Sequence, residues 1–292
     1  MIGVDLGGTR IKAGVVINGE LTDSISVNTQ AENGPAQLLD VIAETVRKLD
    51  RCPAAVGLAI PGGVNPEGLC WRLPNVPGFE GINIRAELTQ RLGCRVVVEN
   101  DATTAALAEL YLGHGRSHPS FAMVTLGTGI GGGIVIDGHL RRGRHGFAGE
   151  IGHTPVNRSG AGWPCACGLQ GCVESYAGTR GLLRKYAELG GTADEIRPIS
   201  EAARRGDGAA RTTFAAMGEA LGIGLAALQN TLDLDAIVFT GGISASFDLI
   251  ESALRSSLTK YVFGPPLADI PLLVSELGDR TGLLGAAYLT TL

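Results

Sequence analysis

One short pattern occurs twice in the chain and limits the folds that it can adopt. Residues 14–21 read Gly-Val-Val-Ile-Asn-Gly-Glu-Leu, and residues 133–140 read Gly-Ile-Val-Ile-Asp-Gly-His-Leu. Each copy follows an apolar segment and a glycine-rich turn, at residues 6–9 and at residues 126–129. Asn-Gly and Asp-Gly are typical two-residue hairpin turns. The pattern therefore predicts two similar halves, each beginning with a strand, a glycine turn and a β-hairpin.

A second echo keeps the same order along the chain. Residues 56–63 and residues 237–244 each contain an apolar strand followed by Gly-Gly. Separate hairpins can resemble one another by chance, but two echoes in the same order favour an internal duplication.

Strands and helices alternate along the chain, which is typical of α/β architecture. The expected strands are 2–6, 12–17, 21–27, 54–60, 95–99, 121–126, 133–136, 236–240 and 271–275, and the expected helices are 35–49, 84–92, 102–112, 173–189, 208–232, 246–262 and 279–289. The polar segment 113–119 is the expected domain junction.

Composition excludes several classes of protein. Glycine accounts for 44 of 292 residues, about twice the usual ~7%, but it does not recur every third residue as in collagen. Apolar residues make up 45% of the chain, which is enough for a large core. The net charge of −5 gives no broad attraction for nucleic acid or anionic membranes. The longest charge-free apolar run, 121–136, is shorter than the ~20 residues of a membrane span, and no signal peptide is expected. These features predict a cytoplasmic protein.

The two glycine turns are candidate phosphate sites. Without a Cβ, the backbone of Gly7-Gly8 and of Gly127–Gly129 can approach a ligand, and successive N–H groups can form an anion-binding nest. Thr9 and Thr128 could add hydroxyl donors, and Lys12 could add a charge. The alternative is that both are ordinary tight hairpins.

Two familiar phosphate motifs do not apply. The chain contains no Gly-Lys pair, so there is no Walker A loop. Residues 127–132 match the Gly-x-Gly-x-x-Gly spacing of dinucleotide sites, but a strand is expected after them instead of the helix that such a site requires.

Three cysteines lie within eight residues and follow a histidine. Cys165, Cys167 and Cys172, together with His153, form a Cys₃His set, which is common in tetrahedral structural zinc sites. Four protein ligands would leave no open position, so the zinc would be structural. The alternative is a group of buried thiols beside a surface histidine.

Three acidic residues lie near these features. Asp101 follows an expected strand, where α/β proteins bind ligands, although it could be only the N-cap of the next helix. Glu150 and Glu174 flank the cysteine loop and could bind sugar hydroxyls or could be solvated surface carboxylates.

Six motifs occur in a fixed order: Asp5-Leu6-Gly7-Gly8-Thr9-Arg10, Pro74-Asn75, Glu99-Asn100-Asp101-Ala102, Leu126-Gly127-Thr128-Gly129, Glu150-Ile151-Gly152-His153 and Cys165-x-Cys167-Gly168-x-x-Gly171-Cys172-x-Glu174. Together they resemble the ROK family, which groups bacterial sugar kinases with related repressors. The resemblance implies an actin/hexokinase-like (ribonuclease H-like) duplicated α/β fold with two lobes around a cleft. The smaller lobe would comprise 1–116 and 278–292, and the larger lobe would comprise 117–277 with the zinc loop.

The resemblance also implies a role for each motif. Asp101 would be the general base that takes a proton from a sugar hydroxyl, which then attacks the γ-phosphate of ATP with Mg²⁺ on the phosphates. Asp5 would orient Mg²⁺ through water, and His153 would use one ring nitrogen for zinc and the other for sugar. The implied sugar-binding residues are Gly62, Asn75, Asn100, Asp101, Glu150, His153 and Glu174, and the implied nucleotide or phosphate residues are Asp5, Gly7, Gly8, Thr9, Lys12, Gly127, Thr128, Gly129, Gly241 and Gly242.

The implied reaction is phosphorylation of a hexose at its 6-hydroxyl. Residues 74–79 resemble the branch of the family that acts on glucose, and kinases of N-acetylmannosamine, N-acetylglucosamine, fructose or allose are the alternatives. A sugar-sensing regulator of the same family would need an N-terminal helix-turn-helix, whereas a strand is expected from Ile2. The family resemblance further implies a homodimer or homotetramer, with no nucleic-acid or membrane partner.

Overall fold

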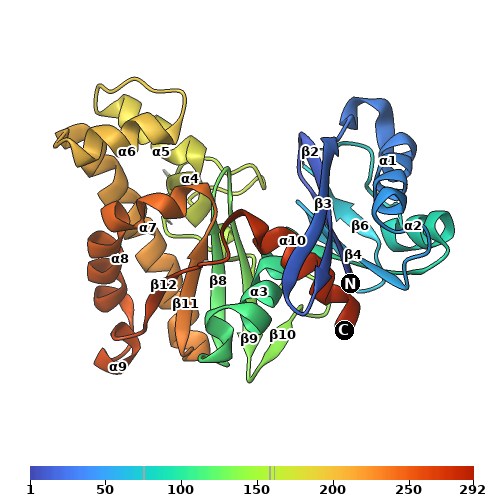
Figure 1. The fold of residues 1–292 in the computed structure, drawn as a ribbon. Helices are drawn as coiled ribbons and strands as arrows, with labels where there is room; N and C mark the ends of the chain where they lie inside the picture. Colours follow the sequence, from blue (N-terminus) through green and yellow to red (C-terminus); the bar gives the residue numbers. More distant parts are fainter. Residues whose placement is uncertain (75, 158, 161) are drawn as a thin grey trace. The chain divides into compact units, whose positions relative to one another are not determined.

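The computed structural model describes residues 1–74, 76–157, 159–160 and 162–292, which divide into two compact units (Figure 1). Unit 1 comprises residues 1–123, 133–149 and 276–292, and unit 2 comprises residues 124–132 and 150–275. The predicted lobe boundaries stay a prediction.

A five-stranded mixed sheet forms the centre of unit 1, with the order β3-β2-β1-β4-β7. Its strands are β1 (Ile2–Leu6), β2 (Arg10–Ile17), β3 (Glu20–Asn28), β4 (Ala55–Ile60) and β7 (Arg95–Asn100). The first three strands are antiparallel, and β4 and β7 continue the sheet in parallel. Asn18 and Gly19 join β2 to β3 with φ angles of 52° and 83°, as the Asn-Gly turn predicts.

The second sheet repeats this strand order as β10-β9-β8-β11-β12. Its strands are β8 (Phe121–Leu126), β9 (Ile130–Ile136), β10 (His139–Arg141), β11 (Ala236–Thr240) and β12 (Leu272–Val274). Asp137 and Gly138 have φ angles of 53° and 72°, so the two hairpins also share their turn geometry. The shared order is what an internal duplication predicts.

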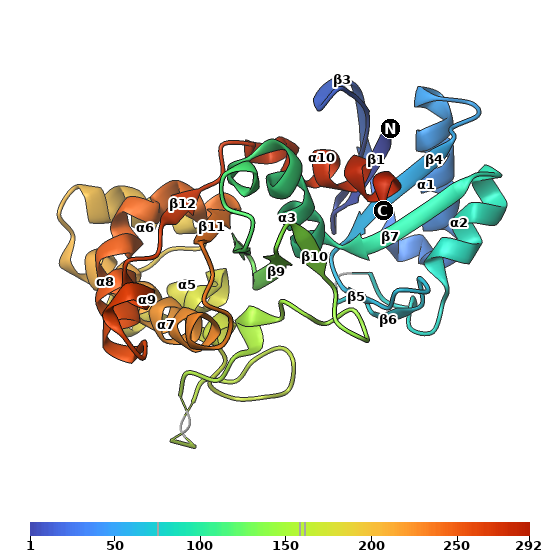
Figure 2. The same ribbon diagram turned by 90° about the horizontal axis from the view of Figure 1, so that it is seen from below.

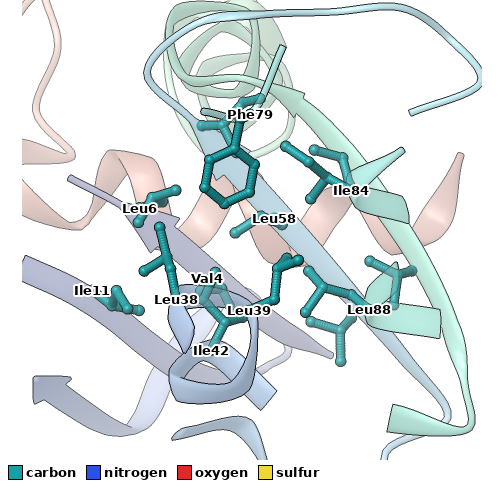
Figure 3. Close-up of a cluster of buried hydrophobic side chains, with 14 of the residues drawn as sticks. Val4, Leu6, Ile11, Leu38, Leu39, Ile42, Leu58, Phe79, Ile84 and Leu88 are labelled. Atoms are coloured by element: carbon teal, nitrogen blue, oxygen red, sulfur yellow. The ribbon is translucent and has the colours of Figure 1, made fainter. Parts of the chain in front are cut away.

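The core of unit 1 lies between the first sheet and two helices, α1 (Gly34–Leu49) and α2 (Ile84–Leu92). Figure 3 shows Leu38, Leu39 and Ile42 of α1 pointing toward side chains from the strands and from α2. These α1 residues are fully buried, which confirms the helical spacing that the sequence predicts.

Glycines allow unusually close packing between this sheet and α10 (Thr281–Tyr288). A Cβ on Gly57 of β4 would lie 1.7 Å from the carbonyl oxygen of Ala286, and a Cβ on Gly3 of β1 would lie 2.2 Å from that of Leu283. On α10 itself, a Cβ on Gly285 would lie 2.0 Å from the carbonyl oxygen of Thr104 in α3 (Asp101–Leu112). Backbone therefore contacts backbone where β1, β4, α3 and α10 meet.

The remaining helices include two that the sequence did not predict. Unit 2 contains α4 (Val173–Ala177), α5 (Thr179–Glu188), α6 (Ile196–Arg204), α7 (Gly208–Leu232), α8 (Phe247–Tyr261) and α9 (Pro265–Ala268). The single helix expected over 173–189 is wrong, because the chain becomes extended at Gly178 and restarts as α5. The sequence also missed α6, α9, β10 and the small hairpin of β5 (Gly63–Val64) and β6 (Cys70–Arg72). No helix in the described part of the chain is long and apolar enough to cross a membrane.

We predict that Gly57→Ala destabilises the protein by about 3 kcal/mol, at the upper end of the cost of overpacking, because the backbone of α10 cannot easily move away. Urea unfolding would measure the change. Gly208→Ala is the matched control, since a Cβ there meets no atom within 4 Å, and it should be neutral or slightly stabilising. Equal stability of the two variants would contradict the packing argument.

Candidate active site

In unit 1, Asn100 and Asp101 lie where β7 ends and α3 begins. Asn100 is the N-cap: its Oδ1 accepts the N–H groups of Ala102 (2.9 Å) and Thr103 (3.0 Å). The alternative that Asp101 serves as the cap is therefore wrong. Asp101 is instead the first helical residue, exposed, with Oδ1 accepting the N–H of Ala102 at 2.8 Å. Its carboxylate lies at the positive end of the helix dipole, which favours a negative charge.

Asn100 also forms a hydrogen bond to Gly62, another predicted sugar-binding residue of unit 1. Its Nδ2 donates to the carbonyl oxygen of Gly62 at 3.2 Å. A Cβ at Gly62 would lie 2.2 Å from the carbonyl oxygen of Arg72, so a larger residue would displace this segment. The structure thus brings Gly62 and Asn100 together, whereas predicted Asn75 lies outside the described residues.

A buried ion pair fixes the residue before Asn100. Glu99 is only 4% exposed, and its Oε2 lies 2.7 Å from Nε of Arg142. Its Oε1 accepts the N–H of Asn100 at 2.9 Å. Burial raises the pKa of Glu99, while the Arg142 charge and the Asn100 N–H oppose that rise. Arg142 was not predicted as a site residue, because it is distant in sequence from the motif that it contacts.

The first glycine turn, Gly7-Gly8-Thr9, joins β1 to β2 and is accessible to solvent. The N–H of Gly7 donates to the carbonyl oxygen of Arg10 at 2.9 Å. Thr29, which is 1% exposed and was also not predicted, braces the turn by donating its hydroxyl to the carbonyl oxygen of Gly7 at 3.0 Å. The carbonyl oxygen of Gly7 is therefore hydrogen-bonded within the protein, while Gly8 and Thr9 are exposed to solvent.

Asp5 and Lys12 are directly opposite each other in the β1–β2 ladder. Burial raises the pKa of Asp5, and the positive charge of Lys12 opposes that rise. Asp5 also lies against α10, because a Cβ on Gly282 would be 2.7 Å from its Oδ2.

In unit 2, the four predicted metal ligands come together. The ligand atoms of His153, Cys165, Cys167 and Cys172 all lie within 4.8 Å of one another. Sγ of Cys167 is 3.9 Å from Sγ of Cys172, and Sγ of Cys165 is 3.6 Å from Nδ1 of His153. Tetrahedral zinc, with Zn–S bonds of about 2.3 Å, would set two sulfur ligands about 3.8 Å apart. The donor set and its spacing therefore fit a tetrahedral soft cation such as zinc.

The local fold of the loop produces this cluster. Gly168 takes a φ of 93° and donates its N–H to the carbonyl oxygen of Cys165, which turns the chain between the first two thiols and the third. A Cβ on Gly171 would lie 2.1 Å from the carbonyl oxygen of Asn157. Burial raises the pKa of the Cys172 thiol to about 12, and the nearby cysteines add to the rise.

His153 presents its two ring nitrogens to different groups. Nδ1 faces the thiol of Cys165, while Nε2 lies 3.7 Å from Oε2 of Glu150. The ring can therefore serve a metal with one nitrogen and a polar ligand with the other. Burial raises the pKa of Glu150, and the Glu174 carboxylate raises it further, against the opposing effect of His153.

The second glycine turn also lies in unit 2, between β8 and β9. The N–H of Gly127 donates to the carbonyl oxygen of Gly129 at 3.1 Å, and Thr128 is exposed at the tip. Gly241, with a φ of 93°, packs beside the end of β8, since a Cβ there would lie 2.4 Å from the carbonyl oxygen of Leu126. A Cβ on Gly242 would meet open space. The predicted phosphate residues of this unit thus form one group around the end of β8.

Comparisons with known proteins all point to one family, over nearly the whole chain. The ROK family profile matches residues 1–291. The chain belongs to the ROK family. It is 37% identical to a glucokinase of Streptomyces coelicolor, over 99% of this chain and 96% of that protein. It is 33% identical to an N-acetyl-D-glucosamine kinase of Mannheimia succiniciproducens, over 99% and 98%.

A solved ROK structure confirms the predicted fold class. The ROK glucokinase of Streptomyces griseus, in complex with glucose and AMPPNP, superposes with a TM-score of 0.83 at 36% identity, covering 99% of this chain and 98% of that one. The resemblance to the ROK family and to its duplicated α/β fold is thereby confirmed.

We predict that Arg142→Met lowers the free energy of unfolding of this ROK protein by about 2–3 kcal/mol. The loss is smaller than the ~3–5 kcal/mol for breaking a fully buried pair, because the Arg142 side chain is 29% exposed. Combining it with Glu99→Gln should recover most of the loss, since no buried charge is then left unpaired. Arg144→Met, in the same loop and exposed, is the control in urea unfolding. A double variant less stable than Arg142→Met would refute the pairing.

Proposed function

We propose that this ROK protein transfers the γ-phosphate of ATP to the 6-hydroxyl of glucose. The prediction of an ATP-dependent sugar kinase is confirmed by the family and by its kinase relatives. The observation that carries the glucose proposal is the similarity, at 36–37% identity, to glucokinases over nearly the whole chain.

In the proposed reaction, Asp101 is the general base. Its carboxylate takes the proton of the sugar hydroxyl as the hydroxyl oxygen forms its bond to the γ-phosphorus and ADP leaves. Asn100, fixed by Glu99 and by its own capping bonds, keeps the first turn of α3 in place. Asn100, Gly62 and Asn75 would bind sugar hydroxyls in unit 1, as would Glu150, His153 and Glu174 in unit 2.

The glycine turns would contact ATP. The proposed phosphate-binding groups are Gly7, Gly8, Thr9 and Lys12 in unit 1, and Gly127, Thr128, Gly129, Gly241 and Gly242 in unit 2. Mg²⁺, bound with ATP, would neutralise phosphate charge, and Asp5 is proposed to orient its water shell. The half-buried position of Asp5, opposite Lys12 in the β1–β2 ladder, supports a fixed orientation.

A structural zinc ion in the Cys₃His cluster is part of the proposal. The spacing of the four donor atoms supports it, and four protein ligands leave no position for a substrate. We also propose a cytoplasmic location, which would keep these thiols reduced, and a homodimer or homotetramer.

N-acetyl-D-glucosamine is the second candidate substrate, because a kinase of that sugar is 33% identical over 98% of its length. Recombinant protein assayed with ATP and Mg²⁺ against glucose, N-acetylglucosamine, N-acetylmannosamine, fructose and allose separates them. We expect the highest kcat/KM for glucose. A higher value for another sugar would overturn the glucose proposal, and no turnover of any sugar would overturn the kinase proposal.

Asp101→Asn should lower kcat by about 10²–10⁴-fold, because the amide cannot accept the hydroxyl proton. Sugar binding, measured by calorimetry, should change little, since the amide still accepts the Ala102 N–H. Asp194→Asn, at an exposed position outside the proposed site, is the control. A kcat near that of the wild type would refute the assignment of the base.

A further inference from the structure

The thiol–imidazole cluster is connected to the second glycine turn by the short segment that follows its last cysteine. Cys172 is fully buried and directly precedes α4, whose first residue, Val173, is 1% exposed. Val173 donates its N–H to the carbonyl oxygen of Thr154, the residue after His153. The start of α4 is therefore fixed by one cluster residue, Cys172, and by the backbone beside another, His153.

Glu174, in the first turn of α4, contacts both the cluster and the turn. Its Oε1 lies 3.6 Å from Sγ of Cys165, and its Oε2 accepts the N–H of Ile130 at 3.1 Å. A Cβ on Gly129 would lie only 2.3 Å from that Oε2. Glycine at this position thus lets the carboxylate lie directly against the turn.

Thr179, at the start of α5, holds the other side of the same turn. Its N–H and its hydroxyl both donate to the carbonyl oxygen of Gly127, each at 3.0 Å. Gly178 packs beside the carbonyl oxygen of Thr128, to which a Cβ would approach within 2.9 Å. Residues 174–179 therefore contact the turn at both of its ends, through Gly127 and through Ile130.

The first glycine turn is held by a comparable threonine hydrogen bond. There, Thr29 donates its hydroxyl to the carbonyl oxygen of Gly7 at 3.0 Å, as Thr179 does to Gly127. Thr29 directly follows β3, so it belongs to the same hairpin that follows the turn. In the second half β10 has only three residues, and the bracing threonine comes from beyond the cysteine loop, 38 residues after Arg141. A loop of that length needs its own means of ordering.

We propose that Thr179 and Glu174 are positioning residues for the nucleotide-binding turn, and that the metal cluster orders them. Metal occupancy and nucleotide affinity are then coupled through residues 172–179. The inference rests on the proposed role of residues 127–129 in binding phosphate, and it assigns the metal a part in holding the nucleotide as well as in ordering its own loop.

The first test removes one hydroxyl. Thr179→Val keeps the shape of the side chain and should weaken AMPPNP binding by about fivefold, the fold-change expected for one lost hydrogen bond of ordinary strength. Glucose affinity should stay within twofold, and Thr179→Ser should restore nucleotide binding. Thr231→Val is the control, because its hydroxyl donates to the carbonyl oxygen of Ala227 within α7. Calorimetry with AMPPNP needs no turnover, so the result does not depend on which sugar is phosphorylated.

The second test adds metal removal. Wild type and Thr179→Val are compared with and without chelation, with metal content measured directly and folding checked by circular dichroism. Cys167→Ser serves as a genetic counterpart to chelation, and Cys52→Ser, at an exposed thiol outside the cluster, is its control. We expect chelation to weaken AMPPNP binding at least fivefold in the wild type and by a smaller factor in Thr179→Val.

Three results would overturn the coupling: metal-free, folded wild type with unchanged AMPPNP affinity; purified wild type that contains no metal; or equal losses on chelation in the two proteins. If neither wild type nor variants bind AMPPNP, the proposed function fails instead, and the substrate assays above would show this independently.

Discussion

The architecture of unit 1 depends on direct backbone contact between α10 and the strands that it covers. Gly3 and Gly57 let carbonyl groups of α10 approach β1 and β4 to a distance that any side chain would prevent, and Gly285 does the same for α3. Figure 2 shows α10 between α3 and these strands. Because α3 begins at Asn100 and Asp101, the proposed base is placed by this packing. Backbone contacts leave little freedom to adjust, which suits a carboxylate that must meet a hydroxyl within hydrogen-bond distance.

The glycine excess therefore has two physical causes, and the sequence revealed only one. Gly7, Gly127 and Gly241 follow strands and could be recognised as turns from their position. Gly3 and Gly57 lie inside strands, where glycine usually weakens a sheet, and nothing near them in sequence identifies the helix that needs the space. Their partner lies more than 200 residues away in the chain. Close packing of this kind can be recognised only when both elements are placed.

The same distinction separates what could be predicted of the site from what could not. The proposed metal ligands, the hairpin turns and the motif at Asn100 each consist of residues close together in the sequence, so their spacing could be recognised. Arg142, Thr29 and Thr179 act on a motif that lies far along the chain, and an isolated arginine or threonine carries no local signal. The helix expected over 173–189 failed for a related reason: Gly178 breaks it where the chain must pass the turn at Thr128.

The two halves of the chain fix their glycine turns with threonines that come from different parts of the sequence. A glycine turn that binds phosphate must expose its N–H groups, so it cannot be fixed from its outer face. In each half a threonine hydroxyl donates a hydrogen bond to the carbonyl oxygen of the turn's first glycine: Thr29 to Gly7 and Thr179 to Gly127. The first half obtains that threonine from its own hairpin. In the second half β10 has only three residues, and the loop after it carries Glu150 and His153, so the corresponding threonine, Thr179, lies beyond that loop. In the proposed coupling, a metal bound by the four-residue cluster would restore this constraint, because Cys172 lies seven residues before Thr179. The proposed coupling would thus let the loop of one half carry the proposed sugar-binding residues while both turns keep a threonine on the first glycine carbonyl.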